Sequence, residues 1–251
     1  MYYLGPEYSF SHEAALKFSN KVYPTKSISE IFYIVEKEKV FGIVPLENSL
    51  EGPIHESLDN LFKYDNIYIN YVYNMGIKLF LASKDGKIRD TLYTNHYAYK
   101  ESEEFIKNLN INKIEFVSST SEAARLAKEN NSMCICSKLA VENYGLNIIK
   151  EINTENNYTK FALISNKPSY YGNRSIILFT IKNKPGALYN VLKIFYKENI
   201  NLTMIYSRPL KTIPWEYYFY LEFEGKYNKK LLEQLKNVTE ILKFKGSYKI
   251  L

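Results

Sequence analysis

The sequence predicts an α/β protein in which a mostly parallel sheet, covered by helices, is followed by a small ferredoxin-like unit. Two observations support this prediction. Short apolar runs alternate with amphipathic stretches through residue 164, and such alternation is typical of a parallel sheet. After a polar break at residues 165–172, the order becomes strand-helix-strand-strand-helix-strand, which is the ferredoxin-like arrangement.

The part before the break contains six apolar runs that are expected to form strands. Between them lie stretches whose apolar residues share one helical face, such as Ile54, Leu58 and Leu61. Pro53 before that stretch and Gly145 after a later one are typical of a helix start and a helix end. The expected strands are 2–4, 40–44, 69–82, 114–117, 133–136 and 159–164, and the expected helices include 13–18, 54–62, 101–109, 122–128 and 139–144.

The part after the break is expected to form a second domain. A unit of this kind leaves one sheet edge open, so we expect it to pair with a second copy of itself. The predicted domains are residues 1–166 and residues 174–251. In the second domain, strands are expected at 176–181, 202–207, 216–223 and 241–248, with one helix opened by Pro185-Gly186 and another at 229–237.

Charge and composition favour a soluble protein that acts on a small molecule. The net charge of the 251 residues is +6, and the lysines are scattered among acidic residues rather than gathered in one block. No nucleic-acid-binding face is therefore expected. The start lacks the charged and apolar segments of an export signal, and no apolar run reaches membrane length. We therefore expect a cytoplasmic protein without membrane contact.

The two cysteines, Cys134 and Cys136, lie in one of the expected strands. We expect their side chains to point to opposite faces of that strand, which argues against a disulfide between them. Two thiols also make a poor metal site. The sequence therefore predicts buried thiols in a core, and neither a metal nor an organic cofactor.

Small polar residues follow several of the expected strands, at 5–11, 45–49, 118–121 and Ser137. In a parallel sheet such turns gather at the carboxyl ends of the strands, where α/β proteins bind ligands. Helix starts at this edge offer free N–H groups and a partial positive charge, which favour an anion. Each serine alone is more often a helix cap than a ligand contact, but four such turns on one edge favour an anion-binding cleft.

Four segments resemble, in the right order, the motifs of prephenate dehydratases. Residues 5–15 (GPEYSFSHEAA) are similar to the family's G-P-x-G-T-F-S-H-x-A-A opening, and residues 42–52 (GIVPLENSLEG) to its V-P-I-E-N-S-x-E-G segment. Residues 119–124 (STSEAA) resemble S-T-x-x-A-A, and residues 157–161 (NYTKF) resemble N-x-T-R-F. The resemblance spans essentially the whole chain and implies a two-lobed catalytic domain that is similar to periplasmic binding proteins.

Three positions depart from the family pattern: Tyr8, Lys160, and Asn95-His96, which stands where many members have Ser-His-Pro. Tyr8 stands where the family has its second glycine, so this loop is expected either to be reshaped or to hold Tyr8 over the cleft. Lys160 replaces the arginine of T-R-F. A lysine keeps the positive charge but lacks the planar fork that grips a carboxylate with two bonds.

The resemblance implies the conversion of prephenate to phenylpyruvate, in which carbon dioxide and hydroxide leave and the ring becomes aromatic. The protein then has to hold a dianion and to help the hydroxide leave. By resemblance, Thr159 donates to the leaving oxygen, Lys160 steadies a carboxylate, and Glu47 or water supplies the proton. The remaining residues implied at the substrate are Asn48, Ser49, Ser119, Thr120, Ser11 and Phe161. Taken without the resemblance, these positions also fit helix caps, strand residues and, for Phe161, a core residue.

The C-terminal part resembles the ACT domain, a family of small amino-acid sensors. Residues 183–188 (NKPGAL) are similar to its N-x-P-G-A-L turn, and residues 199–209 (NINLTMIYSRP) to its I-N-L-T-x-I-E-S-R-P segment, with Tyr206 in place of the glutamate. The resemblance implies L-phenylalanine as an effector, bound between two C-terminal domains of a homodimer or a dimer of dimers. The implied effector residues are Gly186, Ala187, Leu188, Asn201, Leu202, Ser207 and Arg208.

Two other functions are compatible with parts of the sequence. The departures at Tyr8 and Lys160 are also expected of a non-catalytic regulator that binds an aromatic amino acid or an aromatic acid. A solute-binding receptor would use a similar two-lobed cleft, but its export signal is missing. Thr159 and the run Glu47-Asn48-Ser49 match the family motifs, and they favour the enzyme.

Overall fold

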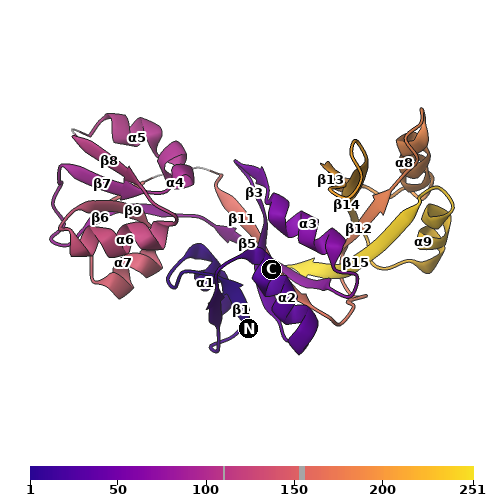
Figure 1. Cartoon of the computed structure of the whole chain (residues 1–251), viewed down its shortest axis with the longest axis horizontal. Helices are drawn as coiled ribbons and strands as arrows, with labels where there is room; N and C mark the ends of the chain where they lie inside the picture. Colours follow the sequence, from indigo (N-terminus) through magenta and orange to yellow (C-terminus); the bar gives the residue numbers. More distant parts are fainter. Residues whose placement is uncertain (110, 153–155) are drawn as a thin grey trace. The chain divides into compact units, whose positions relative to one another are not determined.

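The computed structural model describes residues 1–109, 111–152 and 156–251. The chain divides into two compact units. Unit 1 comprises Met1–Ile31, Glu47–Gly52 and Asn74–Phe161, and unit 2 comprises Phe32–Leu46, Pro53–Tyr73 and Ala162–Leu251. Both units combine strands and helices (Figure 1), so the predicted α/β class is confirmed.

Unit 1 is built around a sheet with the strand order β10-β6-β9-β7-β8. The strand β7 pairs in parallel with β8 and β9, whereas β6 pairs antiparallel with β9 and β10. The predicted mostly parallel sheet is therefore mixed, because β6 runs against both of its neighbours, β9 and β10. The strands are β6 (Leu79–Ser83), β7 (Thr91–Thr94), β8 (Lys113–Phe116), β9 (Met133–Cys136) and β10 (Asn147–Ile152).

Helices cover both faces of this sheet (Figure 1). On one face lie α6 (Thr120–Glu129) and α7 (Lys138–Tyr144), and on the other α4 (His96–Glu101) and α5 (Glu103–Lys107). The single helix expected at 101–109 is thus two short helices. They meet at Ser102, which ends α4 and precedes α5.

The two cysteines of β9 correct one expectation. Both are buried and free, and their sulfur atoms lie 3.6 Å apart. The prediction of opposite faces was wrong, because residues i and i+2 of a strand share a face. Cys134 and Cys136 pack in the core beneath α6 and α7, while Met133 and Ile135 pack in the core on the other side. Their role as core thiols is confirmed.

The start of the chain forms a strand-helix-strand segment within unit 1. The strands β1 (Tyr2–Leu4) and β2 (Tyr23–Thr25) pair in parallel, and α1 (Phe10–Leu16) connects them. Helix α1 begins three residues earlier than the expected 13–18, because the side chain of Ser9 caps it by accepting a bond from the amide of His12. The capping serine therefore lies inside the 5–11 turn.

Three strands of the chain extend from one unit into the other along the backbone. They are β3 (Gly42–Asn48), β5 (Tyr68–Gly76) and β11 (Tyr158–Ser165). The expected single strand at 69–82 is two strands, β5 and β6, that join different sheets. The neighbouring elements are α2 (Ile28–Glu38), β4 (Gly52–Pro53) and α3 (His55–Lys63).

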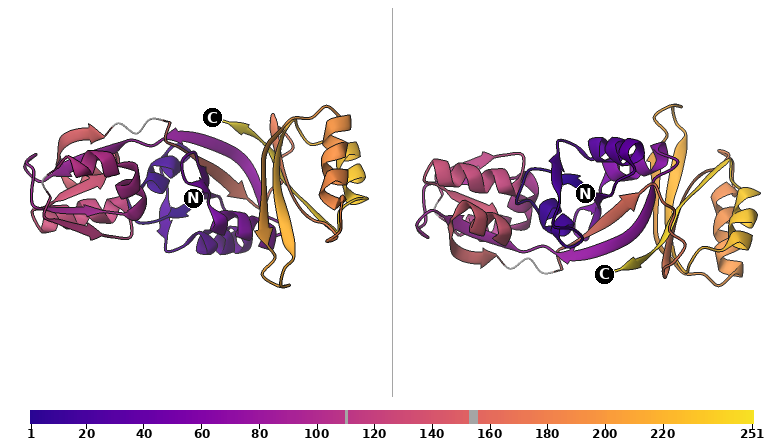
Figure 2. Two further views of the ribbon diagram at one scale, coloured as in Figure 1. Left: turned by 90° about the horizontal axis from the view of Figure 1, so that it is seen from above. Right: turned by 90° about the horizontal axis from the view of Figure 1, so that it is seen from below.

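The C-terminal part of unit 2 has the predicted ferredoxin-like order. Its sheet runs β13-β14-β12-β15 with antiparallel pairings, and β13 is the end strand. Helices α8 and α9 lie side by side on one face (Figure 2), where they pack against Phe219, Leu221 and Phe223 of β14. The elements are β12 (Arg174–Thr180), α8 (Ala187–Lys197), β13 (Leu202–Pro209), β14 (Tyr217–Glu224), α9 (Lys229–Lys236) and β15 (Ile241–Ile250).

The last strand, β15, connects this sheet to the rest of unit 2. It pairs with β12 and, in parallel, with β5 through Lys249 and Ile250. At Gly246 the backbone has φ +122°, and a Cβ there would lie 2.3 Å from the carbonyl oxygen of Ile69. A glycine is therefore required where the strand passes β5 so closely.

A buried lysine of β15 closes the end of helix α3. The ammonium of Lys245 is fully buried and donates to the carbonyl oxygens of Tyr64 and Asp65, which follow the helix, and of Ile67. A positive charge is favourable at a helix C-terminus, where carbonyl groups lack partners. Burial lowers the pKa of Lys245 to about 8.

The helices of the described ranges are short. The longest, α2 and α8, have 11 residues each. In this part of the chain we find no helix that combines the length and the apolar character needed to cross a bilayer.

Candidate functional site

The end of β3 and the start of β11 bring the predicted catalytic residues together. The amide nitrogen of Asn48 donates to the hydroxyl oxygen of Thr159 over 3.1 Å. The ammonium of Lys160 lies 2.9 Å from a carboxylate oxygen of Glu47. Residues more than a hundred positions apart in the chain thus form one group. We call Glu47, Asn48, Asn157, Thr159 and Lys160 the Thr159 cluster.

The orientation of the Asn48 amide determines what the Thr159 hydroxyl can do. The Asn48 oxygen accepts from the backbone amides of Leu50 at 2.9 Å and Glu51 at 3.0 Å. Its NH₂ group must then be the end that faces Thr159, so the hydroxyl oxygen is an acceptor in that bond. Thr159 is buried, and among the described residues no acceptor takes its proton. The hydroxyl can therefore donate to a bound molecule.

The Glu47–Lys160 pair places a cation beside this hydroxyl. The side chains of Glu47 and Lys160 are 19% and 29% exposed, so the pair is largely buried but still accessible to solvent. A lysine ammonium has three donors, and in the described part of the chain only Glu47 takes one of them. The remaining donors are available for an anionic ligand.

The sequence analysis missed two polar residues, Asn157 within the cluster and Glu101 behind it. Asn157 is 3% exposed; its oxygen accepts from Asn48 over 2.8 Å, and its nitrogen donates to Glu101 over 2.7 Å. Burial raises the pKa of Glu101, although the bond from Asn157 opposes that rise. Asn157 belongs to the N-x-T-R-F motif and could have been predicted as a site residue. Glu101 lies in a run of charged residues, and nothing in its local sequence indicates a place near the site.

Two of the predicted substrate-binding residues have structural partners instead. The hydroxyl of Ser49 accepts from the amide of Tyr158 over 2.8 Å and donates to the carbonyl of Asn156 over 2.5 Å. It therefore fastens the loop after β3 to the start of β11. Phe161 is 2% exposed and lies in the core, as its residue type alone would suggest.

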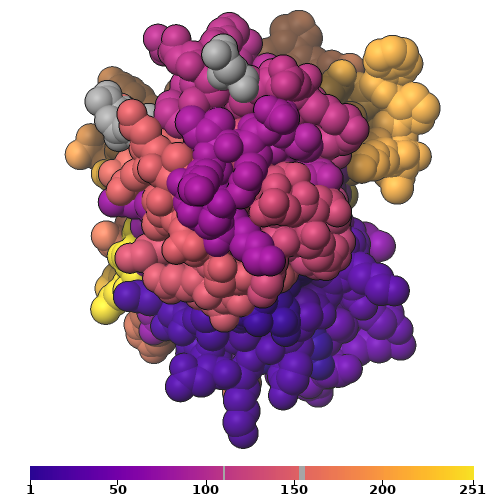
Figure 3. Space-filling view, turned by 90° about the vertical axis from the view of Figure 1, so that its left-hand side faces the viewer, coloured from indigo at the N-terminus to yellow at the C-terminus, as the bar shows by residue number. Residues whose placement is uncertain are grey.

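The predicted polar turns form a second group in unit 1. The hydroxyl of Ser121 donates to the carbonyl of Glu7, and that of Ser137 donates to the carbonyl of Tyr8 over 3.1 Å. The 5–11 turn is thereby bonded to the starts of α6 and α7, and in Figure 3 the indigo N-terminal segment lies against the pink segment that contains these helices. Three of the four expected turns meet in this way, whereas the turn at 45–49 belongs to the Thr159 cluster.

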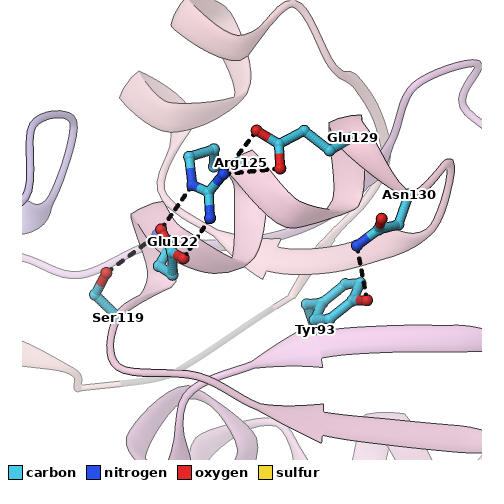
Figure 4. A network of polar contacts seen from close by, with 6 residues as sticks. All are labelled: Tyr93, Ser119, Glu122, Arg125, Glu129 and Asn130. Atoms are coloured by element: carbon cyan, nitrogen blue, oxygen red, sulfur yellow. Dashed lines mark hydrogen bonds and ion pairs between the residues drawn. The ribbon is translucent and has the colours of Figure 1, made fainter.

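The remaining predicted residues, Ser11, Ser119 and Thr120, lie at helix starts in this second group. Ser119 caps α6 by accepting from the amide of Glu122 over 3.1 Å, next to the ion pairs of Arg125 with Glu122 and Glu129 (Figure 4). Ser11 and Thr120 are both buried, at 8% and 6% exposure. Capping explains the position of Ser119, and its hydroxyl proton is not used in that bond.

Tyr8 keeps the backbone shape that a glycine would supply. Its φ is +64°, a left-handed conformation that costs most residues roughly 1–2 kcal/mol. The Tyr8 amide donates to a ring nitrogen of His12 over 2.8 Å, and the Tyr8 ring packs edge-on against Tyr144 at 5.4 Å. The ring of Tyr8 thus contributes to the packing of α7. Burial lowers the pKa of His12, which favours the neutral ring that accepts this bond.

The predicted effector residues separate into two sets in unit 2. Gly186, Ala187 and Leu188 line a pocket of about 280 Å³, together with residues 215–217 and Phe219. Gly186 has φ +79° and precedes α8, so its backbone takes a conformation that favours glycine. The other set lies outside this lining, at the start of β13 or along it: Asn201, Leu202, Ser207 and Arg208.

Two family models match the chain. The model described as prephenate dehydratase matches residues 1–169, and the model described as ACT domain matches residues 175–240.

Known proteins of the same kind are similar over nearly the whole chain. The bifunctional chorismate mutase/prephenate dehydratase of Aquifex aeolicus is 35% identical over 262 residues, which cover 98% of this chain and 72% of that protein. The prephenate dehydratase of Methanocaldococcus jannaschii is 32% identical, with 99% and 97% covered. The crystal structure of prephenate dehydratase from Arthrobacter aurescens in complex with L-Phe has the same fold, with a TM-score of 0.89, 23% identity, and 99% and 89% covered.

Proposed function

The chain belongs to the prephenate dehydratase family, and from this premise we propose that the Thr159 cluster is where prephenate becomes phenylpyruvate. The observation that carries the proposal is the bond from Asn48 to Thr159, beside the ion pair of Lys160 and Glu47. The hydroxyl of Thr159 is a neutral hydrogen-bond donor, and the ammonium of Lys160 beside it is a cation. Together they suit a substrate that has a leaving hydroxyl and two carboxylates.

The reaction breaks two bonds of the substrate. The ring carboxylate leaves as carbon dioxide, and the electron pair of the broken C–C bond moves into the ring. The opposite ring carbon then releases its hydroxyl oxygen, which takes up a proton and leaves as water. Aromatisation favours the forward direction, so the protein has to stabilise the charge that develops on the leaving oxygen.

Thr159 is assigned the contact with the leaving oxygen. Its hydroxyl oxygen is held by Asn48, and Asn48 is held by two backbone amides and by Asn157. The donor is therefore positioned before the substrate arrives, and it needs no reorganisation as charge develops. A threonine hydroxyl is a weak acid, so the proton itself comes from water, or from Glu47 once it has taken up a proton, because the carboxylate paired with Lys160 carries none.

Lys160 is assigned to a substrate carboxylate. Its ammonium donates to Glu47 over 2.9 Å, and this bond fixes the cation near the start of β11. A single point charge tolerates small changes in the position of the carboxylate better than a bidentate fork does. This explains how lysine can serve where the family motif has arginine.

The second carboxylate is assigned to the helix starts of the second group. The N-terminal turns of helices carry free N–H groups that favour anions. Ser119 and Thr120 at the start of α6, and Ser11 in the first turn of α1, add neutral hydroxyl donors. Ser49 and Phe161 are assigned to positioning of the site rather than to substrate contact, because their side chains are engaged in the protein.

Turnover of prephenate by the purified protein tests the proposed function directly. Phenylpyruvate should appear without any added cofactor, and a chelator should leave the rate unchanged. A folded protein that binds prephenate but produces no phenylpyruvate under any condition would favour the non-catalytic regulator instead.

We further propose that L-phenylalanine is the effector and that it occupies the pocket at Gly186. The L-Phe complex of the Arthrobacter aurescens protein supports this choice. The carboxylate of the effector would meet the start of α8, its ring the wall of Trp215 and Phe219, and its ammonium the carboxylate of Glu216. Glu216 would thereby take the part of the glutamate that Tyr206 replaces.

A homodimer formed through the open edge of β13 would complete this site. Asn201, Leu202 and Ser207 lie at or on this end strand and would be contributed by the second copy. The guanidinium of Arg208 is bonded to Asp59 within its own chain, so it is assigned to that pair rather than to the effector. Calorimetry with phenylalanine and sedimentation of the intact protein test both statements.

A further inference from the structure

Helix α3 is bonded to the C-terminal sheet through the carboxylate of Asp59, which meets β13 and β14, and through the carbonyl of Phe62, to which Lys243 of β15 donates over 2.7 Å. The guanidinium of Arg208 on β13 reaches both oxygens of Asp59, at 3.2 and 3.1 Å. The hydroxyl of Tyr218 on β14 donates to the same carboxylate over 2.7 Å, and Lys211 lies 2.9 Å away. We call Asp59, Arg208, Tyr218 and Lys211 the Asp59 clamp.

The clamp is sheltered, which makes its geometry specific. The side chains of Asp59 and Arg208 are 18% and 16% exposed, whereas that of Lys211 is 73% exposed. Burial by itself would raise the pKa of Asp59, but the bonds from Arg208, Tyr218 and Lys211 outweigh it and hold the pKa at about 2. The ring of Tyr218 also stacks on Phe62 of α3, with centroids 4.3 Å apart.

The same helix is bonded to the strand that carries the Thr159 cluster. The hydroxyl of Ser57 donates to the carbonyl of Pro45, and the amide of Ile54, which precedes α3, donates to the carbonyl of Leu46 over 2.8 Å. Pro45 and Leu46 come directly before Glu47 and Asn48 on β3. A displacement of α3 would therefore move the backbone that supports Lys160 and Thr159.

The other side of the clamp adjoins the proposed effector pocket. Tyr217 and Phe219 of β14 line the pocket, and Tyr218 between them turns to the opposite face and bonds Asp59. Arg208 of β13 is the register partner of Tyr218. A ligand that shifts the start of β14 thus acts on the two main donors of the clamp at once.

We propose that Asp59 is a positioning residue that transmits occupancy of the effector pocket to the catalytic residues. The route runs from the start of β14 to Asp59, along α3, through Ser57 and Ile54 to β3, and so to Glu47 and Asn48. This inference rests on the proposed function, and it adds the residues by which the effector acts. For inhibition, the effector must bind one arrangement of the clamp better than another, because equal affinity shifts nothing.

The substitution Asp59→Asn tests the route. It keeps the size of the side chain and removes the charge that Arg208 requires. The readout is the ratio of kcat/KM without and with saturating phenylalanine, measured on the full-length protein. We expect this ratio to be on the order of 5- to 150-fold for the wild type, the usual range of coupling, and to fall close to one in Asp59→Asn. Calorimetry should show that the variant still binds phenylalanine.

Two further variants separate transmission from loss of structure. Tyr218→Phe keeps the ring on Phe62 and removes only the bond to Asp59, so it should reduce the ratio without lowering the melting temperature appreciably. Lys211→Met removes the exposed member of the clamp and should leave the ratio at the wild-type value, because a solvated ion pair contributes little.

The outcomes distinguish this route from the proposed function. If wild type is inhibited and both Asp59→Asn and Tyr218→Phe are inhibited equally, the route is wrong while the effector assignment stands. If Asp59→Asn stays folded but no longer binds phenylalanine, Asp59 acts on binding and not on transmission, which also overturns the route. A wild type that converts prephenate without any response to phenylalanine would overturn both the effector and the route.

Discussion

Replacement of Thr159 by valine should remove most of the catalytic rate while leaving the fold and substrate binding almost unchanged. Valine has nearly the shape of threonine, so the buried side chain leaves no void. The hydroxyl is lost in both of its functions, as acceptor from Asn48 and as donor to the leaving oxygen.

The two losses differ in size. One well-placed donor to a developing oxyanion contributes about 3 kcal/mol, so kcat should fall on the order of a hundredfold or more. The Asn48 amide keeps its bond to Asn157 and its two backbone bonds, so the cost in stability should be about 1 kcal/mol. KM should change little, because the interaction strengthens only as the hydroxide departs.

Steady-state and single-turnover formation of phenylpyruvate from prephenate measure the effect, with thermal unfolding as a check of the fold. Thr159→Ser is the matched control because it keeps the hydroxyl. Its kcat should stay within about tenfold of the wild-type value, a smaller decrease than the loss of a donor causes. The assignment of Thr159 would be refuted by a Thr159→Val protein with near-normal kcat. A serine variant as slow as the valine variant would equally show that the hydroxyl is not what matters.

Three further predictions concern other residues. Lys160→Arg should remain active, because arginine restores the family pattern, whereas Lys160→Ala should raise KM for prephenate; equal KM values would mean that this side chain points away from the substrate. Since burial raises the pKa of Glu101, its ionised form costs stability at neutral pH. Glu101→Gln should therefore melt higher than wild type at pH 8, and the difference should vanish as the pH falls and the carboxyl protonates. Lys245 has a folded-state pKa of about 8 against 10.5 for an ordinary lysine, so the unfolded chain binds more protons in this window and stability rises with pH. Relative to Lys245→Met, the free energy of unfolding of the wild type should rise by at most about 3 kcal/mol between pH 8 and 10.5, because the three carbonyl partners of the ammonium oppose the lowering of its pKa. Denaturant unfolding at several pH values measures this rise.

The fold class and the ferredoxin-like C-terminal unit could be predicted from local pattern, because each strand and helix there buries its own apolar face. The start of α8 after Gly186 and the α6 cap at Ser119 are local features of backbone and side chain. The end of β3 and the start of β11 could be assigned to one site only through the resemblance to known motifs, because nothing in the local sequence relates Asn48 to Thr159.

Other features depended on contacts that no short segment contains. The expected strand at 69–82 is two strands, because the chain leaves one sheet and enters another, which is a property of topology rather than of apolar content. Glu101 has the appearance of a solvated helix residue, and only its burial against Asn157 distinguishes it from Glu103 and Glu104.

The sequence by itself determined the fold class, the ferredoxin-like order of the C-terminal part and which residues match the family motifs, because these depend on periodicity, turn residues and residue type. The tertiary structure alone decided that the hydroxyl of Ser49 is bonded to the start of β11, that Phe161 lies in the core, and that Arg208 is bonded to Asp59. The physical reason is that a side chain's partner depends on distance in space, and burial then decides how strongly the two interact.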